Sequence, residues 1–167
     1  MIHRSIELVH QSFPQGKGQG VAGATALTSA LLARAAVQRL GGIATPDKLH
    51  IVIDGEEIEG GEFMLGMATS LHRLFAGMRP FWGVGEGGVR FTAVRGDVRR
   101  VAWSAPGILA GRPNRSVRED AGFVSRNARA VLVRMDCGTT IDGELTAPEP
   151  GRVVALTADD SVPFVRA

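Results

Sequence analysis

From residue 43 to the C-terminus the chain alternates between short apolar runs and clusters of turn-forming residues. Each run has roughly the four to eight residues of a buried strand, which is short for a helix. The turn clusters are Asp54-Gly55, Gly60-Gly61, residues 85–88, Arg95-Gly96, residues 136–138, residues 148–151 and Asp159-Asp160. Several short strands separated by turn signals are typical of an antiparallel sandwich or barrel. We predict a mainly β fold of the α+β class, built as an antiparallel β-sandwich.

The first of the expected strands shows a clear two-residue period. In residues 48–55, Leu49, Ile51 and Ile53 fall on one side, whereas His50 and Val52 fall on the other. This alternation predicts a strand with one buried face. Further strands are expected at residues 62–68, 88–94, 128–136, 139–145, 152–158 and 162–167, and another near the N-terminus at residues 6–13.

A long helix is expected at residues 21–40, which are rich in alanine and leucine. Leu27, Leu31 and Ala35 recur at every fourth position, so they lie on one helical face. Gly41-Gly42 follows and is suited to ending the helix.

A short second helix is expected after Asp97, whose side chain can cap the helix N-terminus. Val98, Val101 and Ala102 would then face inward, with Arg99 and Arg100 facing outward. Pro106 is expected to interrupt this helix, because proline lacks the backbone N–H that a helix interior needs.

The length of 167 residues fits one domain, with residues 1–42 as a helical lead-in and residues 43–167 as the sandwich. No stretch reaches the roughly 18 apolar residues of a membrane span, and Arg4, Glu7 and His10 interrupt any secretory pattern. The single cysteine, Cys137, cannot form an internal disulfide. A cytoplasmic location is the expectation, with peripheral attachment to a membrane as an addition to it.

The basic residues are unevenly distributed, although the net charge is only +2. Residues 90–134 contain ten arginines against three acids. Such an excess suits phosphate, anionic lipid or a nucleic-acid backbone, and it equally suits a solvated face spread over several elements. Only 5% of the residues are aromatic and no stacking platform is visible, so no nucleic-acid partner is expected.

Two weaker motifs are explained without a ligand. Gly18, Gly20 and Gly23 match a dinucleotide fingerprint in spacing, but no strand leads directly into them, so a flexible lead into a helix is expected. The four histidines show no spacing with cysteine or acids that is typical of metal ligands. No metal site is predicted.

The tetrapeptide Ile-Asp-Gly-Glu occurs twice, at residues 53–56 and 141–144. The first copy lies in an acidic run that ends at Glu62, which indicates a solvated hairpin tip, with a divalent-cation site as the alternative. The second copy is also expected to be a hairpin turn. Its alternative is a continuous strand in which Asp142 and Glu144 share one face about 7 Å apart, suited to a base and an orienting acid.

Residues 48–167 resemble the C-terminal domain of the diacylglycerol kinase catalytic family, which includes bacterial lipid kinases and sphingosine kinases. The motifs occur in the family's order: "VIDGEE", "MATSLHRLFAGMRPFWGVGEGGVRFTAV", "VRRVAWSAPGILAGRP", and "TTIDGEL" followed by "VVALTADDSVPFVRA". Each motif is loose alone, and their order and spacing carry the resemblance. The predicted helix at residues 21–40 fits the family's helix that enters this domain.

The resemblance implies a β-rich sandwich that forms the lipid-substrate half of an ATP-dependent kinase. It implies Asp142 as the base for the lipid hydroxyl and Glu144 as a second carboxylate that assists it or the metal. The first copy has no catalytic role in the family pattern. The expected partners are a lipid substrate, an anionic membrane surface, an N-terminal nucleotide-binding domain and a second copy of the chain in a homodimer.

Two departures from the family limit what this chain can do. Its Gly-Gly-Asp-Gly-Thr phosphate loop is missing, so we expect part of a longer two-domain protein, or a relative that lost the front half. Either way the isolated chain is expected to be inactive, with Mg²⁺ and ATP bound only in the full-length kinase. Residues 82–88 replace the family's Pro-x-Ala…Asp-Gly segment, which is associated with a structural metal.

An apolar stripe is the candidate for the lipid-side wall. Its members are Met64, Met67, Leu71, Leu74, Phe75, Met78, Phe81 and Trp82. The same residues equally suit an ordinary core. The rival functional hypothesis is a stand-alone, non-catalytic module that binds a lipid or a protein partner.

Overall fold

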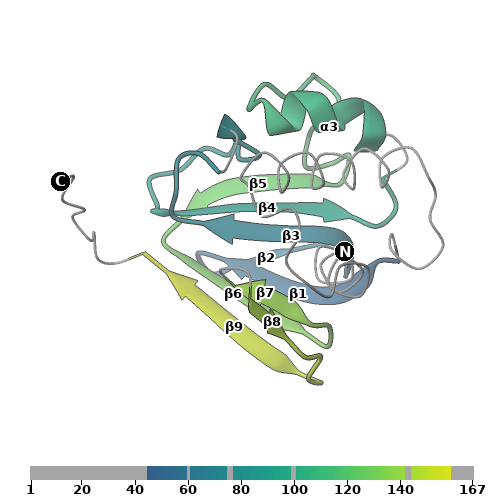
Figure 1. Cartoon of the computed structure of the whole chain (residues 1–167), viewed down its shortest axis with the longest axis vertical. Coiled ribbons are helices and arrows are strands. Elements are labelled where there is room, and N and C mark those ends of the chain that lie inside the picture. The colour runs from purple at the N-terminus through teal and green to yellow at the C-terminus, as the bar shows by residue number, and fades with distance from the viewer. Residues whose placement is uncertain (1–44, 60, 75–76, 99–100, 142–143, 159–167) are drawn as a thin grey trace, which may run out of the picture.

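The computed structural model describes residues 45–59, 61–74, 77–98, 101–141 and 144–158. The predicted helix at residues 21–40 and the strands predicted at residues 6–13 and 162–167 lie outside these ranges. The described elements, in chain order, are β1 (Asp47–Ile53), β2 (Glu56–Ile58), β3 (Glu62–Thr69), β4 (Val89–Arg95), α3 (Val101–Leu109), β5 (Phe123–Ala128), β6 (Ala130–Met135), β7 (Thr139–Ile141), β8 (Glu144–Thr146) and β9 (Arg152–Thr157) (Figure 1).

Seven of these strands form one sheet in the order β5-β4-β3-β1-β6-β9, with β2 paired to β1. β7 and β8 form a separate two-stranded hairpin. All pairings between the described strands are antiparallel. The predicted mainly β, α+β fold is therefore confirmed.

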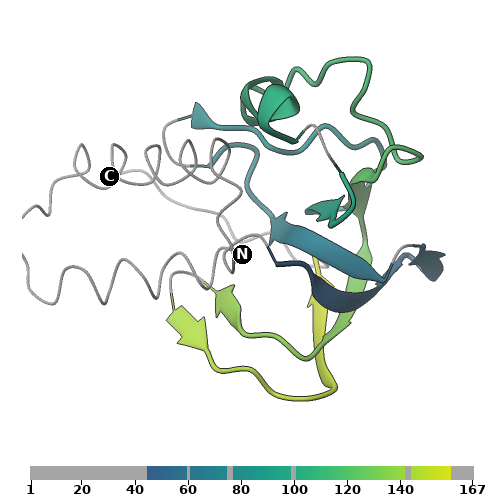
Figure 2. The ribbon, with the colours of Figure 1, turned by 90° about the vertical axis from the view of Figure 1, so that its right-hand side faces the viewer.

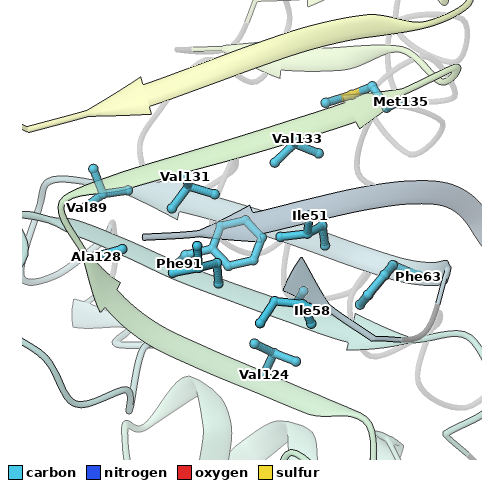
Figure 3. Close-up of a cluster of buried hydrophobic side chains, with 12 residues drawn as sticks. Ile51, Ile58, Phe63, Val89, Phe91, Val124, Ala128, Val131, Val133 and Met135 are labelled. Carbon is cyan, nitrogen blue, oxygen red and sulfur yellow. The ribbon is translucent and has the colours of Figure 1, made fainter. Parts of the chain in front are cut away.

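The seven-stranded sheet folds over between β3 and β1. One half is β5-β4-β3, the other is β1-β6-β9 with β2, and the two halves enclose a shared core. The halves join where β1 meets β3 through only two residue pairs, whereas β1 and β6 share five. Phe91 and Val124 from one half pack in the same buried cluster as Ile51 and Val131 from the other (Figure 3). Strands that are several places apart in a sheet share a core only when the sheet bends, so one folded sheet supplies both layers of the sandwich.

The alternation predicted for the first strand is confirmed. Ile51 and Ile53 are buried, and Leu49 packs against the core from a half-buried position. His50 is exposed on the opposite face. Burial of alternate residues on one face is what stabilises β1 at the centre of the sheet.

β5 and β6 act as one strand with a corner in it. Only Arg129 separates them, yet β5 pairs with β4 in one half of the sheet and β6 pairs with β1 in the other. Strands that pass from one layer to the other at a bend are the usual corners of orthogonally packed sheets. The run at residues 128–136 predicted only the second part of this strand, and β2 and β5 were not predicted.

The helix α3 continues through Pro106 to Leu109, so the predicted interruption is wrong. Pro106 is exposed and lies in the sixth position, where the missing N–H removes a single hydrogen bond to the first turn. The Pro106 carbonyl still accepts a hydrogen bond from the Ala110 N–H at 3.1 Å. Val98 and Val101 pack inward as predicted, beside the buried Ile108.

Candidate functional site

An apolar cavity of about 680 Å³ lies between the core face of the sheet and the β7–β8 hairpin. β1, β3, β6 and β9 supply its floor, and β7 supplies part of its wall. Figure 2 shows the hairpin set apart from the seven-stranded sheet. The apolar side chains in the lining include Leu49, Phe63, Met64, Leu65, Met67, Leu74, Phe81, Phe91, Val133, Met135, Ile141, Val154 and Leu156.

The cavity floor continues the hydrophobic core. Val154 and Leu156 of β9 pair with Val133 and Val131 of β6, and paired residues point to the same face. Val131 and Val133 are buried in the core, while Val154 and Leu156 are only half-buried. The core face therefore extends beyond the buried core and supplies an apolar lining for the cavity.

The second Ile-Asp-Gly-Glu copy lies at the end of the hairpin that borders this cavity. Ile141 lines the cavity and pairs with Glu144. The catalytic candidate Asp142 and its neighbour Gly143 connect these paired residues and lie outside the described residues. This register agrees with the predicted hairpin turn, and the alternative of Asp142 and Glu144 on one continuous strand is wrong. Glu144 is exposed.

Two hydroxyl groups on β7 form a polar feature beside this apolar cavity. The Oγ1 atoms of Thr139 and Thr140 are buried and have no hydrogen-bond partner among the described residues. Both residues belong to the cavity lining. Their residue type did not mark them as site residues in the sequence; the available signal was their position directly before the second Ile-Asp-Gly-Glu copy.

The structure distributes the predicted lipid-wall residues over several environments. Four of them line the cavity: Met64, Met67, Leu74 and Phe81. Trp82 does not line it and packs, together with Met64, against a second core cluster beside α3. Leu71 is 56% exposed and Met78 is half-buried, and neither lines the cavity. Phe75 lies outside the described residues.

The first Ile-Asp-Gly-Glu copy forms a tight hairpin turn with a structural contact. Asp54 and Gly55 both have positive φ, 50° and 87°, which matches the turn type that an Asp-Gly pair favours between strands. The Asp54 Oδ1 atom accepts hydrogen bonds from the N–H groups of Arg129 and Ala130, at 2.9 and 2.8 Å. The turn therefore fastens the corner between β5 and β6.

The acids at this turn are exposed, as predicted for a solvated hairpin tip, and two of them also form ion pairs. Glu56 contacts Arg126 at 2.7 Å and Glu57 contacts His50 at 2.9 Å. No group of three potential metal ligands occurs among the described residues, so they do not support the cation-site alternative.

Several arginines of the basic segment take part in ion pairs. Arg126 binds both Glu56 and Glu119. The hydrogen bond to Glu56 contributes most to raising the pKa of Arg126, and the hydrogen bond to Glu119 contributes next. Arg95 lies 3.5 Å from Asp97, and Arg118 lies 3.1 Å from Asp120. Arg112, Arg115, Arg129 and Arg134 are exposed.

Residues 82–88 run along the edge of β5. The Asn127 N–H donates to the Val84 carbonyl at 3.1 Å, and the N–H groups of Trp82 and Gly83 donate to the Ser125 Oγ atom. A Cβ on Gly87 would lie 1.8 Å from the Ala128 carbonyl carbon. Glycine is therefore required at this position by the close backbone approach.

Comparison with protein-family models, with curated proteins and with solved structures found no match. These comparisons neither support nor oppose the resemblance to diacylglycerol kinases. Among the described residues, no helix is long and apolar enough to cross a membrane.

Proposed function

We propose that this chain is the C-terminal, lipid-substrate-binding half of an ATP-dependent lipid kinase of the diacylglycerol kinase type. The observation that carries the proposal is the apolar cavity bordered by the strand that leads into the second Ile-Asp-Gly-Glu copy. A lipid kinase needs an acyl-chain site directly beside the group that accepts the hydroxyl proton. The cavity volume of about 680 Å³ lies within the range common for small-molecule sites.

The proposed chemistry is phosphoryl transfer to a lipid hydroxyl. Asp142 takes the hydroxyl proton, and Glu144 assists Asp142 or the metal. Both roles come from the resemblance. The nucleotide and Mg²⁺ are held by an N-terminal domain, because this chain lacks the family's phosphate loop. Phosphoryl transfer depends mainly on positioning and charge stabilisation, so the contribution of this half is to hold the lipid and one base.

Attachment to an anionic membrane surface is part of the proposal. Trp103 on α3 is 84% exposed, and the exposed Arg112 and Arg115 follow the helix. Tryptophan and arginine together suit the interface of a bilayer with acidic head groups. A homodimer is proposed as well, with the β9 edge as the surface for self-pairing, since β9 pairs with β6 alone among the described strands.

The proposal is tested by measuring binding of a short-chain diacylglycerol, dioctanoylglycerol, to the full chain by calorimetry. We expect saturable binding, and Met67→Glu should weaken it about tenfold or more, because a charge in an apolar lining opposes entry of the acyl chain. The matched control is Leu132→Glu. Leu132 is 45% exposed on β6 and does not line the cavity, so its variant should bind like the original chain.

Failure of the original chain to bind dioctanoylglycerol would overturn the proposal. Equal loss of affinity in the Met67 and Leu132 variants would also overturn it, because binding would then not depend on the cavity. The chain could also bind dioctanoylglycerol yet support no phosphorylation when it is joined to a nucleotide-binding half. That result would favour the stand-alone binding module.

A further inference from the structure

We propose that residues 136–151 form a hinged flap that opens and closes the apolar cavity. The described parts of this flap are residues 136–141 and 144–151, which carry the β7–β8 hairpin. β7 supplies one side of the cavity, and the sheet supplies its floor. The inference goes beyond the proposed function, because it concerns entry to the cavity and holds for any apolar ligand.

The flap leaves the sheet and returns to it at one place. Met135 of β6 pairs with Arg152 of β9, so the two ends of the flap lie side by side. The Asp136 Oδ1 atom accepts a hydrogen bond from the Gly151 N–H at 2.7 Å, which closes the base of the flap. A segment anchored at such a narrow base can rotate as a unit while the pairing of β6 with β9 stays intact.

The hairpin within the flap has no strand partner in the sheet (Figure 2). β7 and β8 pair only with each other among the described strands, and their register ends at Thr139 and Thr146. Pro148 and Pro150 follow Thr146, and proline has no N–H with which to extend a ladder. The hydrogen bonds of the sheet therefore do not hold the hairpin in place.

The flap adds no buried residue to the core. None of its described residues is buried, whereas Val131, Val133 and Met135 in the preceding strand all are. Cys137 packs against the core from a half-buried position at the base. Segments with few buried contacts open at a low free energy, so the flap can move without breaking the core.

Two hydroxyl groups disfavour the position that the flap has in this structure. The Oγ1 atoms of Thr139 and Thr140 are buried and have no hydrogen-bond partner among the described residues. Leaving a buried hydroxyl unsatisfied costs free energy that contact with solvent would recover. An apolar ligand would act in the opposite direction, because closure over it buries the lining side chains Ile141, Val154 and Leu156.

The experiment measures distances between two spin labels on the full chain by electron paramagnetic resonance, after Cys137→Ser removes the native thiol. The flap pair combines Glu144→Cys with Glu57→Cys, and the control pair within the sheet combines Thr157→Cys with Glu57→Cys. All three labelled positions are exposed. We expect the distance distribution of the flap pair to be about twice as broad as that of the control pair, because the flap takes up more than one position.

Variants of the base and of the hydroxyls should change the flap pair in opposite directions. Asp136→Ala should broaden its distribution further, because the base loses a hydrogen bond. Asp136→Asn is the matched control, since its amide oxygen can still accept that hydrogen bond. Thr139→Val and Thr140→Val remove the unsatisfied hydroxyls and should narrow the distribution toward the position in this structure.

A flap distribution as narrow as that of the control pair would overturn the inference, because the hairpin would then be fixed. No broadening by Asp136→Ala would also overturn it, since the contact with Gly151 would then not hold the base.

Dioctanoylglycerol tests closure over a ligand, and we expect it to narrow the distribution of the flap pair. An unchanged distribution despite binding seen by calorimetry would contradict closure. Absence of binding would contradict the proposed function, whereas a broad flap distribution in the lipid-free chain would still support the flap.

Discussion

At the scale of single residues, two identical tetrapeptides have different settings. Asp54 in the first copy accepts two backbone N–H groups at the corner between β5 and β6. The Asp54 N–H also donates to the Ala130 carbonyl at 3.0 Å. The second copy closes a separate hairpin at the cavity. The partners that distinguish them are distant in sequence, since Arg129 lies 75 residues from Asp54.

We predict that Asp54→Ala lowers the free energy of unfolding by about 2 kcal/mol, because two N–H groups at the corner lose a charged acceptor. Urea denaturation followed by circular dichroism would measure the shift in midpoint. Asp54→Asn is the matched control and should cost less, since its amide oxygen can still accept a hydrogen bond. Equal midpoints for Asp54→Ala and the original chain would show that the clamp does not stabilise the fold.

Arg126 illustrates how pH bears on a single contact. Its hydrogen bonds to Glu56 and Glu119 raise its pKa above that of the unfolded chain. Because the pKa of Arg126 is higher in the folded than in the unfolded chain, its ion pairs stabilise the folded protein at every pH below the unfolded-state pKa. This stabilisation is lost only as the pH rises through the folded-state pKa. The titration of Arg126 therefore adds no pH dependence near neutrality. Its side chain is 30% exposed, so solvent screening keeps each ion pair modest.

At the scale of elements, backbone approach explains the glycine-rich run after Trp82. Gly83, Gly85 and Gly87 alternate with Val84 and Glu86, and a Cβ on each of these glycines would lie within 2.4 Å of a backbone atom of residues 125–129. Val84 is 86% exposed, as expected for a residue that points away from β5. The sequence alone suggested a turn, although the two-residue period of glycine was visible.

We predict that Gly87→Ala lowers the free energy of unfolding by about 2–3 kcal/mol, because the added Cβ would clash with the backbone at Ala128. Gly66→Ala is the matched control, since its Cβ would meet only Leu49 Cδ1 at 3.7 Å and should be tolerated. Thermal denaturation of both variants gives the comparison. Equal destabilisation by both substitutions would show that the close approach at β5 is not the cause.

At the scale of the whole molecule, the folded sheet provides an apolar cavity of about 680 Å³, and the sequence lacks a Gly-Gly-Asp-Gly-Thr phosphate loop. We predict that the isolated chain neither binds Mg-ATP nor phosphorylates diacylglycerol. Joined to the nucleotide-binding half of a diacylglycerol kinase, it should transfer phosphate from ATP to the lipid. Calorimetry with Mg-ATP and a radiolabelled phosphate assay measure the two expectations.

The matched variants for this prediction lie in the second tetrapeptide. In the joined protein Asp142→Asn should abolish phosphorylation while leaving the melting temperature and lipid binding unchanged, because only the proton acceptor is lost. Asp54→Asn, in the first copy, should retain activity. Full activity of Asp142→Asn would remove Asp142 from its proposed role, and ATP binding by the isolated chain would contradict the division into two halves.

Much of the fold was predictable from local pattern. The pattern in residues 48–55, an alternation that ends in the Asp54-Gly55 pair, correctly predicted β1 and its tight turn, since both depend on neighbouring residues. β5 was missed because Ser125, Arg126 and Asn127 give its central part no apolar signal. These three side chains bind distant groups, including the Trp82 and Gly83 N–H groups, Glu56 and the Gly83 carbonyl.

The candidate site was predictable only in part, for the same reason. Apolar composition selected Met64, Met67, Leu74 and Phe81, which do line the cavity, together with Leu71 and Met78, which do not. The residue type of Thr139 and Thr140 gave no signal, because threonine is ordinary in a strand, and only their position before the second Ile-Asp-Gly-Glu copy could have marked them. Their interest arises only when their hydroxyls are seen to lie buried without a partner among the described residues.

The amino-acid sequence by itself determined a mainly β chain, because strand period and turn residues act over a few neighbouring positions. It also predicted a hairpin turn for both Ile-Asp-Gly-Glu copies, since their local patterns are the same. Only the tertiary structure decided that Asp54 holds a corner and that the second hairpin borders a cavity. Those outcomes depend on which distant strands the folding of the sheet brings together, and no local pattern encodes that choice.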